Sequence, residues 1–577
     1  MEPIHIRPLR SRGPLRNELP TGLAALDPLL ARLYAARGIT TANELVLDLK
    51  GMLPVGALHG VYPAVELLLK HREQRIVVIG DFDADGATSS ALVVRCLRDF
   101  GFANIDYLVP NRFEYGYGLS AEIVRVAAQT SPALLVTVDN GISSVDGVAA
   151  AAALGIEVLI TDHHLPGKTL PDAQAIVNPN AQTTSAERGT PGANLAGIGV
   201  AFYLMAALGK TLQDRGHSGA ARIPARYLDL VALGTVADVV PLDHTNRILV
   251  TQGLLRIRSR QCVPGILALL SKAGRDPART VSADLGFTVG PRLNAAGRLD
   301  DISVGIECLL ADDPASAGRL ATVLDGINSD RREIETGMRE QAFAFVDAMS
   351  ERGLPACVCV FDRSWHQGVV GLIAARVRER CHRPVIAFAR DESGQFLKGS
   401  ARSVPGVHIR DLLEAVATAR PGIIDKFGGH AMAAGLSLKE QQFQQFSSTA
   451  AQQLTRLYPQ ADFSGALLTD GELPAASLTL PVARLLRDGG PWGAGFPEPV
   501  WQGDFAVLEQ RTVGERHLKL RVRPLAGSSV LDAIAFNQAG PVFRGSVRLV
   551  YRLDVNEWRG VESPQLVVEQ VSSLEHA

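Results

Sequence analysis

Three short aliphatic runs, each ending in acidic, histidine or glycine residues, constrain the fold of this chain more than any other feature. They occupy residues 76–79, 134–138 and 158–161, and segments of helical periodicity separate them. Such alternation is typical of a parallel sheet with crossover helices. In an open sheet of this kind, ligands bind at the carboxyl ends of the strands. We therefore expect an α/β fold over residues 75–238 whose polar loops converge at one edge.

A turn dense in carboxylates follows the first of these runs. It reads Gly80-Asp81-Phe82-Asp83-Ala84-Asp85-Gly86 and precedes an apolar helical segment. Like charges a few ångströms apart in a partly dehydrated site repel strongly unless they are protonated or a cation lies between them. A single aspartate here would be explained equally well as the cap of the following helix. Three aspartates in one turn favour a divalent metal ion instead.

Polar clusters also follow the second and third runs. Asp139 follows one of them, and the sequence Asp162-His163-His164 follows the other. A lone histidine is more often a surface or satisfied core residue, but adjacent histidines after an aspartate are well placed for ligation and phosphate contact. Asp238 interrupts the apolar run of residues 233–241, where an unpaired carboxylate would be costly. Together these residues predict a site for Mn²⁺ or Mg²⁺, since carboxylate and imidazole ligands suit those ions.

The rest of the chain divides into further regions. Residues 314–352 have apolar residues on one helical face and no internal proline, which predicts a long connecting helix. Strand patterns at residues 356–361 and 384–388 indicate a second, mixed α/β domain, and short alternating strands over residues 503–571 indicate a small β-barrel. We predict an N-terminal extension (1–50), a catalytic domain (51–313), the helix (314–352), the second α/β domain (353–455) and a linker with the barrel (456–577).

One strand of the expected barrel has a basic face. Residues 517–523 alternate strictly, so that Lys519, Arg521 and Arg523 share one face with His517 and the opposite face is apolar. Such a face can track the phosphates of a nucleic acid, although an ordinary solvated face is the alternative. Tyr551 and Trp558 could stack on bases or fill the barrel, and we expect at least one of them to be core.

Composition excludes several classes of protein. The chain has 577 residues, with 58 Lys and Arg against 60 Asp and Glu, a net charge of −2, which excludes a histone-like basic tail but not a local basic groove. Its six cysteines are sparse, which argues against a disulfide framework or structural zinc. No apolar run approaches the about 18 to 20 residues of a membrane span, and the polar N-terminus lacks a signal-peptide pattern. We expect a cytoplasmic protein that does not contact a membrane.

The acidic and histidine motifs resemble, in order, those of the DHH phosphoesterase superfamily. Further motifs are similar to those of its RecJ family of bacterial single-stranded-DNA-specific exonucleases, and the resemblance covers essentially the whole chain. These motifs are N-R-F-E-Y-G-Y-G-L-S (111–120), G-P-R-L-N-A-A-G-R-L-D-D (290–301), W-H-Q-G-V-V-G (365–371) and K-F-G-G-H-A-M-A-A-G (426–435). The resemblance implies a catalytic DHH domain, a DHHA1-type second domain and an OB-fold barrel.

The resemblance also implies roles for individual residues. Two divalent ions would be bridged by Asp139, with Asp83 completing the shell of one ion and Asp81 in the same acidic loop. Asp85, His163 and Asp238 would hold the other ion, and Asp162 would lie behind the ligands. His164 would face the scissile phosphate, while the ions activate the attacking water. The residues expected to contact DNA are Arg112 and Tyr117 near the 5′-terminal nucleotide, then Arg298, Arg402, Ser403, Gly429, His430, Lys519, Arg521 and Arg523.

The activity implied is 5′→3′ degradation of single-stranded DNA to 5′-mononucleotides in recombination and repair, by a strand threaded between two lobes. The family further implies a single-strand-binding protein and a RecQ-type helicase as partners, and we expect a monomer. Two alternatives stay open: a DHH-family phosphodiesterase acting on short oligonucleotides or cyclic dinucleotides, and a non-catalytic single-strand-binding scaffold. The barrel and the 5′-end motif argue against the first, and the complete set of acids and histidines argues against the second, because repelling carboxylates without a metal would destabilise the fold.

Overall fold

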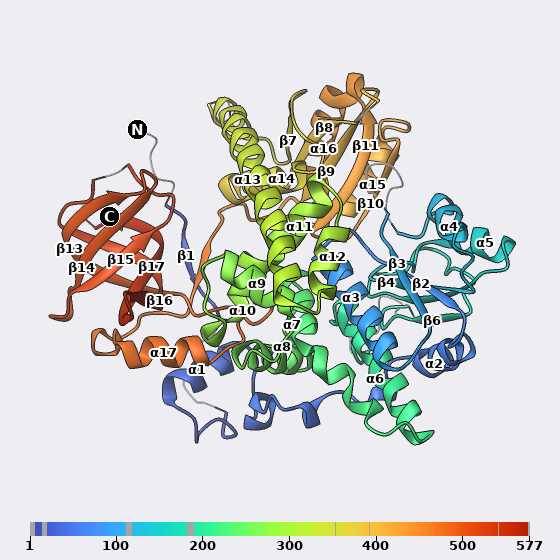
Figure 1. Cartoon of the computed structure of the whole chain (residues 1–577). Coiled ribbons are helices and arrows are strands. Elements are labelled where there is room, and N and C mark those ends of the chain that lie inside the picture. The colour runs from blue at the N-terminus through green and yellow to red at the C-terminus, as the bar shows by residue number, and fades with distance from the viewer. Residues whose placement is uncertain are drawn as a thin grey trace. The chain divides into compact units, whose positions relative to one another are not determined.

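The computed structural model describes residues 6–13, 20–110, 118–181, 190–351, 353–391, 393–540 and 542–574 (Figure 1). The chain forms two compact units. The first comprises residues 1–6, 11–325 and 468–577, and the second comprises residues 7–10 and 326–467.

A five-stranded parallel sheet organises the first unit. Its strand order is β3-β2-β4-β5-β6, with bounds Asn104–Leu108, Arg75–Ile79, Leu134–Val138, Glu157–Thr161 and Ala175–Val177. Every residue of β4 is buried, as expected for a central strand covered on both faces. In the register, Ile79 pairs with Thr137, and Val138 pairs with Thr161. The loops after β2, β4 and β5 therefore start side by side at one edge, which confirms the predicted parallel α/β fold.

Helices cover both faces of this sheet. α4 (Ala121–Ala128) and α5 (Val145–Ala153) pack on the face that presents Val77, Leu135 and Ile160. α3 (Ala84–Asp99) and α6 (Gly197–Asp214) are buried almost all round and pack against each other and α7 (Leu228–Ala237). The other helices before the connecting helix are α1 (Pro28–Ala36), α2 (Val61–Lys70), α8 (His244–Arg258), α9 (Pro264–Lys272), α10 (Ser282–Asp284), α11 (Gly290–Leu299) and α12 (Ser303–Leu310).

The long helix predicted over residues 314–352 is α13, Pro314–Ser350, and it continues from the first unit into the second. The second unit holds a mixed sheet of order β10-β11-β9-β8-β7, in which only β7 and β8 run parallel. Its elements are β7 (Val358–Phe361), α14 (Val370–Cys381), β8 (Val385–Arg390), β9 (Phe396–Arg402), α15 (Ile409–Ala419), β10 (Lys426–Gly429), β11 (Ala433–Lys439) and α16 (Phe443–Leu457). The predicted second α/β domain is confirmed.

The C-terminal strands close into a barrel of order β13-β14-β15-β17-β16, which belongs to the first unit. Their bounds are Trp501–Val513, His517–Pro524, Leu531–Ala535, Val561–Ser573 and Ser546–Trp558, and α17 (Leu480–Asp488) precedes them. Alternate residues of β14 point inward, where Leu518, Leu520 and Val522 are fully buried. Tyr551 is core, whereas Trp558 is 70% exposed, as the sequence predicts for at least one of the pair.

Two short strands, β1 (Leu9–Ser11) and β12 (Leu467–Thr469), pair with each other. Within the described residues, no single helix is long and apolar enough to cross a membrane; only the bent pair Leu49–Ala57 and Val61–Lys70 passes that test of length and composition jointly.

Candidate metal centre

The acidic turn after β2 is held in shape by its own backbone and by α6. Asp83 caps α3, because its Oδ1 accepts hydrogen bonds from the N–H groups of Asp85 (2.9 Å) and Gly86 (3.0 Å). Asp85 is buried, and its two oxygens accept from the N–H groups of Gly197 (2.7 Å) and Ile198 (3.0 Å). Those donors form the N-terminus of α6, which favours a negative charge. The turn therefore caps α3 and also holds its carboxylates in fixed positions.

Asp139 follows β4 with a positive φ of 61°, a conformation that aspartate tolerates better than most residues. The turn after it is fixed, since the Asn140 Nδ2 donates to the carbonyls of Ile79 (3.1 Å) and Val138 (2.9 Å). Gly197 leaves room for this side chain: a Cβ there would lie 2.5 Å from Asp139 Oδ1. The fold thus presses the start of α6 against the carboxylate of Asp139.

The pair His163-His164 follows β5 and is positioned by Asp162. The buried Asp162 carboxylate accepts from the N–H groups of Ile142 (2.9 Å), His163 (2.7 Å) and His164 (3.0 Å), and it lies 2.8 Å from His164 Nδ1. His163 Nε2 instead reaches the other acids, at 3.2 Å from Asp139 Oδ1 and 3.5 Å from Asp238 Oδ2. The two histidines therefore have different surroundings.

Asp238 comes from α7 rather than from a strand end, as the C-cap of that helix. Its buried Oδ2 atom makes no hydrogen bond within the described residues. Val239 directly after it is 68% exposed and has a φ of 65°, which is strained for a β-branched residue. Backbone strain is therefore stored beside this carboxylate.

These side chains form three overlapping groups whose ligand atoms lie within 4.8 Å of one another. The groups are Asp81, Asp83 and Asp139; Asp85, His163 and Asp238; and Asp139, His163 and His164. Asp139 and His163 each belong to two groups, so that the three form one continuous cluster. This geometry places Asp81 beside Asp83 and Asp139.

Burial and mutual repulsion raise the pKa values of three acids in this cluster, Asp85, Asp139 and Asp238. The pKa of Asp85 is raised by burial first and then by Asp238 and Asp83, and that of Asp139 by burial and then Asp85. Burial and then Asp83 raise the pKa of Asp238 to about 7. Oxygen and imidazole donors gathered around an unsatisfied buried oxygen fit a hard or borderline divalent cation such as Mn²⁺ or Mg²⁺.

His164 is a basic group at this cluster whose pKa is raised. Burial would lower its pKa, but the hydrogen bond and the charge of Asp162 outweigh burial and raise it to about 9. The same interaction, with backbone N–H groups, lowers the pKa of the Asp162 carboxyl despite its burial. At neutral pH this geometry gives a cationic imidazole beside an anionic cluster.

Three asparagines that support the cluster were missed by the sequence analysis. Asn294 on α11 accepts from the N–H of Ala84 (2.8 Å), and Asn178 and Asn180 after β6 donate to the carbonyls of His164 (2.9 Å) and His163 (2.6 Å). For Asn178 and Asn180 the signal was the V-N-P-N sequence that follows β6, the last strand of the same sheet. Asn294 lies in a motif for which the sequence analysis expects only contact with DNA.

The residues expected to bind DNA lie in several places. Arg112 and Tyr117 fall outside the described residues. Arg298 lies on α11, in the first unit. In the second unit Arg402 pairs in register with Ala433, and the N–H of His430 donates to the Ala433 carbonyl (2.8 Å), which brings Arg402, Ser403, Gly429 and His430 to one end of β9, β10 and β11.

Arg402, Ser403, Gly429 and His430 are not equally available for contact with a ligand. The Ser403 hydroxyl is fully buried and donates to the Val407 carbonyl (2.6 Å). Arg402 donates to Ser400 Oγ (3.1 Å) and to the Ala401 carbonyl (2.9 Å). Gly429 has a φ of 140°, and a Cβ there would lie 2.5 Å from the Ala433 carbonyl oxygen. Ser403 and Gly429 thus shape this backbone, whichever groups contact a ligand.

On the barrel, two of the three predicted basic residues are already paired. Lys519 Nζ lies 2.9 Å from Asp532 and Arg521 Nη1 lies 2.7 Å from Glu509, whereas Arg523 is exposed. The basic face exists, as the alternation predicts, but acidic neighbours reduce its charge.

Comparison with known proteins gives matches over most of the chain. Residues 75–235 match the model of the DHH family, N-terminal domain; residues 353–456 match the DHHA1 domain; and residues 469–570 match the RecJ OB domain. The single-stranded-DNA-specific exonuclease RecJ of Salmonella typhimurium is 52% identical over 569 residues, which cover 96% of this chain and 97% of that protein. The exonuclease of the same name from Haemophilus influenzae is 48% identical, covering 97% and 99%.

Among solved structures, RecJ in complex with Mn²⁺ from Thermus thermophilus has a TM-score of 0.79 at 29% identity, covering 98% of this chain and 79% of that chain. A parallel sheet with this acidic cluster at its edge, followed by a DHHA1 domain, defines a protein of the DHH class. With the OB domain and similarity over nearly the full length, the chain belongs to the RecJ family of single-stranded-DNA-specific exonucleases.

Replacing Asn294 by alanine should weaken Mn²⁺ binding by about 10-fold to 100-fold, the usual effect of losing a residue that orients metal ligands. The reason is that the Ala84 N–H, between the ligand candidates Asp83 and Asp85, loses its acceptor. Calorimetric titration with Mn²⁺ measures the change. Asn104→Ala, at an exposed asparagine of β3, is the control. Unchanged Mn²⁺ affinity in Asn294→Ala would show that α11 does not position the acidic turn.

The metal-free protein should lose stability between about pH 4 and pH 7. Folding raises the pKa of Asp238 from 3.8 to about 7, so within that interval the folded chain keeps a proton that the unfolded chain has released. The free energy of unfolding therefore falls as pH rises. Bound Mn²⁺ should offset this loss, by about 2.7 kcal/mol at a 100-fold excess over Kd, and more strongly at pH 8 than at pH 5.

Thermal unfolding in chelator and in Mn²⁺ across this pH range measures both effects. Asp238→Asn removes the titrating group and should flatten the pH dependence in chelator. If the stability of Asp238→Asn depended on pH as steeply as that of the parent chain, other titrating groups would be responsible. If Mn²⁺ did not change the unfolding temperature, the proposed metal site would be contradicted.

Proposed function

We propose that this chain is a single-stranded-DNA-specific exonuclease that degrades DNA from the 5′ end to 5′-mononucleotides by two-metal hydrolysis, in recombination and repair. The observation that carries this proposal is the cluster of carboxylates and histidines at the sheet edge, in a chain of the RecJ family. A phosphodiesterase for short oligonucleotides or cyclic dinucleotides would have no evident use for the OB domain. A scaffold without catalysis would leave the repelling acids of the cluster unexplained.

The ligand sets proposed here are those that the family resemblance implies. Asp139 would bridge two ions, with Asp81 and Asp83 on one side and Asp85, His163 and Asp238 on the other. Two of the three groups of side chains support this division, and Asp139 lies beside His163 of the second set. Bound Mn²⁺ or Mg²⁺ would supply Lewis-acid activation of water and would neutralise phosphate charge. The chain's own part is to hold the carboxylates in place through the N–H groups of α6 and the asparagine of α11.

His164 would act on the scissile phosphate. Its Nδ1 side faces Asp162, which fixes the orientation of the ring and keeps it protonated at neutral pH, since the pKa of His164 is raised to about 9. A protonated imidazole can donate a hydrogen bond to a phosphate oxygen as negative charge develops in the transition state. Asp162 would thus be a positioning residue, with no contact to the substrate.

The remaining assignments are proposals that rest on the family motifs. Arg112 and Tyr117 would hold the 5′-terminal nucleotide by phosphate contact and base stacking. The backbone of the DNA would be contacted by Arg298, by Arg402, Ser403, Gly429 and His430, and by Lys519, Arg521 and Arg523. We also propose the domain limits 51–313, 353–455 and 456–577, a monomeric cytoplasmic enzyme, and cooperation with a single-strand-binding protein and a RecQ-type helicase.

The choice of substrate ends tests the proposed function. With Mn²⁺, a linear single strand labelled at its 5′ end should lose its label as a mononucleotide at once, a 3′-labelled strand should shorten before losing its label, and a circular strand should persist. Gel and chromatographic analysis of the products measures this. Asp139→Ala should reduce the rate at least about 10³-fold because the bridging ligand is lost. Degradation of circles, or full activity in Asp139→Ala, would contradict the proposal.

Removing the basic face of the barrel tests its contact with DNA. Replacing Lys519, Arg521 and Arg523 together by alanine should weaken binding and reduce the slope of log K against log salt by at most about 2, since each phosphate contact on a single strand contributes about 0.7. The double variant Asp532→Asn, Glu509→Gln should strengthen binding and increase the salt slope, because it frees Lys519 and Arg521 from their acidic partners. An unchanged slope in both variants would remove this face from the DNA path.

A further inference from the structure

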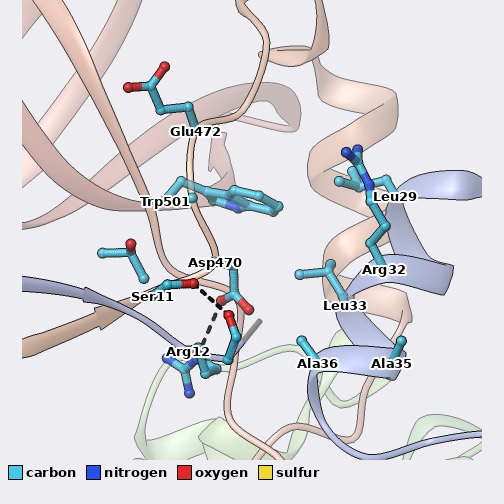
Figure 2. Close-up of a pocket in the computed structure, with 13 residues that line it drawn as sticks. Ser11, Arg12, Leu29, Arg32, Leu33, Ala35, Ala36, Asp470, Glu472 and Trp501 are labelled. Carbon is cyan, nitrogen blue, oxygen red and sulfur yellow. Dashed lines mark hydrogen bonds and ion pairs between the residues drawn. The ribbon is translucent and has the colours of Figure 1, made fainter. Parts of the chain in front are cut away.

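A small cavity lies far from the acidic cluster in sequence, where the end of β1, α1, the segment after β12 and the first residue of β13 meet (Figure 2). Its volume is about 160 Å³, and the residues around it belong to the first unit. Trp501 lies on one side, and Figure 2 shows Leu29 and Arg32 across the cavity from it. Nothing in the proposed hydrolysis uses these residues.

Two buried hydrogen-bond donors in the cavity wall are unsatisfied. Trp501 is only 3% exposed, and its indole Nε1 has no hydrogen-bond partner within the described residues. Arg12 Nε is in the same state and lies 3.5 Å from Asp470 Oδ2, near enough for an ion pair but not for a hydrogen bond. Because an unsatisfied buried donor is costly, each such group in a native protein needs an explanation. An occupant that carries acceptor oxygens would supply one.

One arginine of the cavity wall has no acidic partner among the described residues. Asp470 is engaged by Arg37 at 3.0 and 3.2 Å as well as by Arg12, so one carboxylate faces two guanidinium groups. Arg32 has no ion pair within the described residues, and Glu472 is the only other acid among the described residues of the wall. Of the two guanidinium groups in the wall, that of Arg12 is thus paired with Asp470, whereas that of Arg32 is left for an anionic group of a ligand.

The size and lining of the cavity restrict the rest of the ligand. A cavity of about 150 Å³ lined by apolar side chains holds one benzene ring, so that this one admits a single ring and not two fused rings. Leu29 and Leu33 give it an apolar wall across from Trp501. A phenyl or aliphatic side chain of a peptide would fill this space but leave the indole N–H unsatisfied. A pyrimidine base has carbonyl oxygens on the ring itself.

We propose that this cavity binds a pyrimidine nucleotide, with the base against Trp501, a ring carbonyl accepting from Trp501 Nε1, and the phosphate near Arg32. It is a second nucleotide site, separate from the metal centre and independent of it. The nucleotide can be a free monophosphate or one unit of a single strand, since both present the same groups.

Binding of thymidine 5′-monophosphate to the full chain in chelator, followed by calorimetry, tests the proposal. Trp501→Phe keeps a ring in the core but removes the donor, and should weaken binding by about fivefold to tenfold. Arg32→Ala changes an exposed residue and should weaken binding by about threefold to tenfold. Arg98→Ala, at an exposed arginine of α3, is the matched control and should bind as the parent chain does.

Further ligands test which part of the nucleotide is recognised, and whether the nucleotide is free or part of a single strand. Deoxyadenosine monophosphate, with its larger base, and deoxyribose 5-phosphate, with no base, should bind at least about tenfold more weakly than the thymidine nucleotide. A thymidine oligonucleotide whose affinity also falls in Arg32→Ala would identify the strand as the source, and a fall for the monophosphate alone would identify the free nucleotide.

Three results would overturn the proposal: no binding of the thymidine nucleotide, equal affinity in both variants and the parent, or tighter binding of an acidic peptide ending in phenylalanine. Because chelator prevents metal-dependent hydrolysis, the measurement stands even if the chain were no nuclease. Conversely, a failure here would leave the proposed exonuclease untouched.

Discussion

The structure depends on holding several carboxylates where they repel one another. Asp85, Asp139 and Asp238 are all removed from solvent to a large degree, and the pKa of each is raised first by burial and then by its acidic neighbours. Without a cation this arrangement opposes folding, because charging each acid inside the protein costs more than charging it in the unfolded chain. The surrounding fold must therefore be stable enough to keep the acids together until a metal ion compensates their charge.

The backbone supplies that support through close contacts which only small residues allow. A Cβ at Gly197 would collide with Asp139, and a Cβ at Gly297 would lie 1.7 Å from the Phe82 carbonyl oxygen in the acidic turn. The glycines let α6 and α11 approach the turn closely enough for backbone and side-chain hydrogen bonds. On the other side of α11, Arg292 lies 2.8 Å from Asp325 on α13. A single helix thus joins the acidic turn to the long connecting helix.

The sequence predicted the parts of this site that depend on local pattern. The three strands and the acids and histidines after them could be identified because strand periodicity and turn chemistry are local, and parallel topology then brings the strand ends together. The bonds from Gly197 and Ile198 to Asp85 span more than 100 residues, and no local pattern reports them. Asn294 could not be linked to the acidic turn for the same reason, whereas the roles given to Arg112 and Tyr117 stay predictions.

The same distinction applies to the charges of the barrel. Alternation along β14 predicts which side chains point outward, but it says nothing about the acids on neighbouring strands. Asp532 on β15 and Glu509 on β13 are register neighbours of β14, and each pairs with a cation of the basic face. A phosphate that binds there must replace a carboxylate. The binding free energy gained is therefore only the difference between two similar ion pairs, and not that of a complete new ion pair. A strand that contacted this face would therefore gain little binding free energy from Lys519 and Arg521.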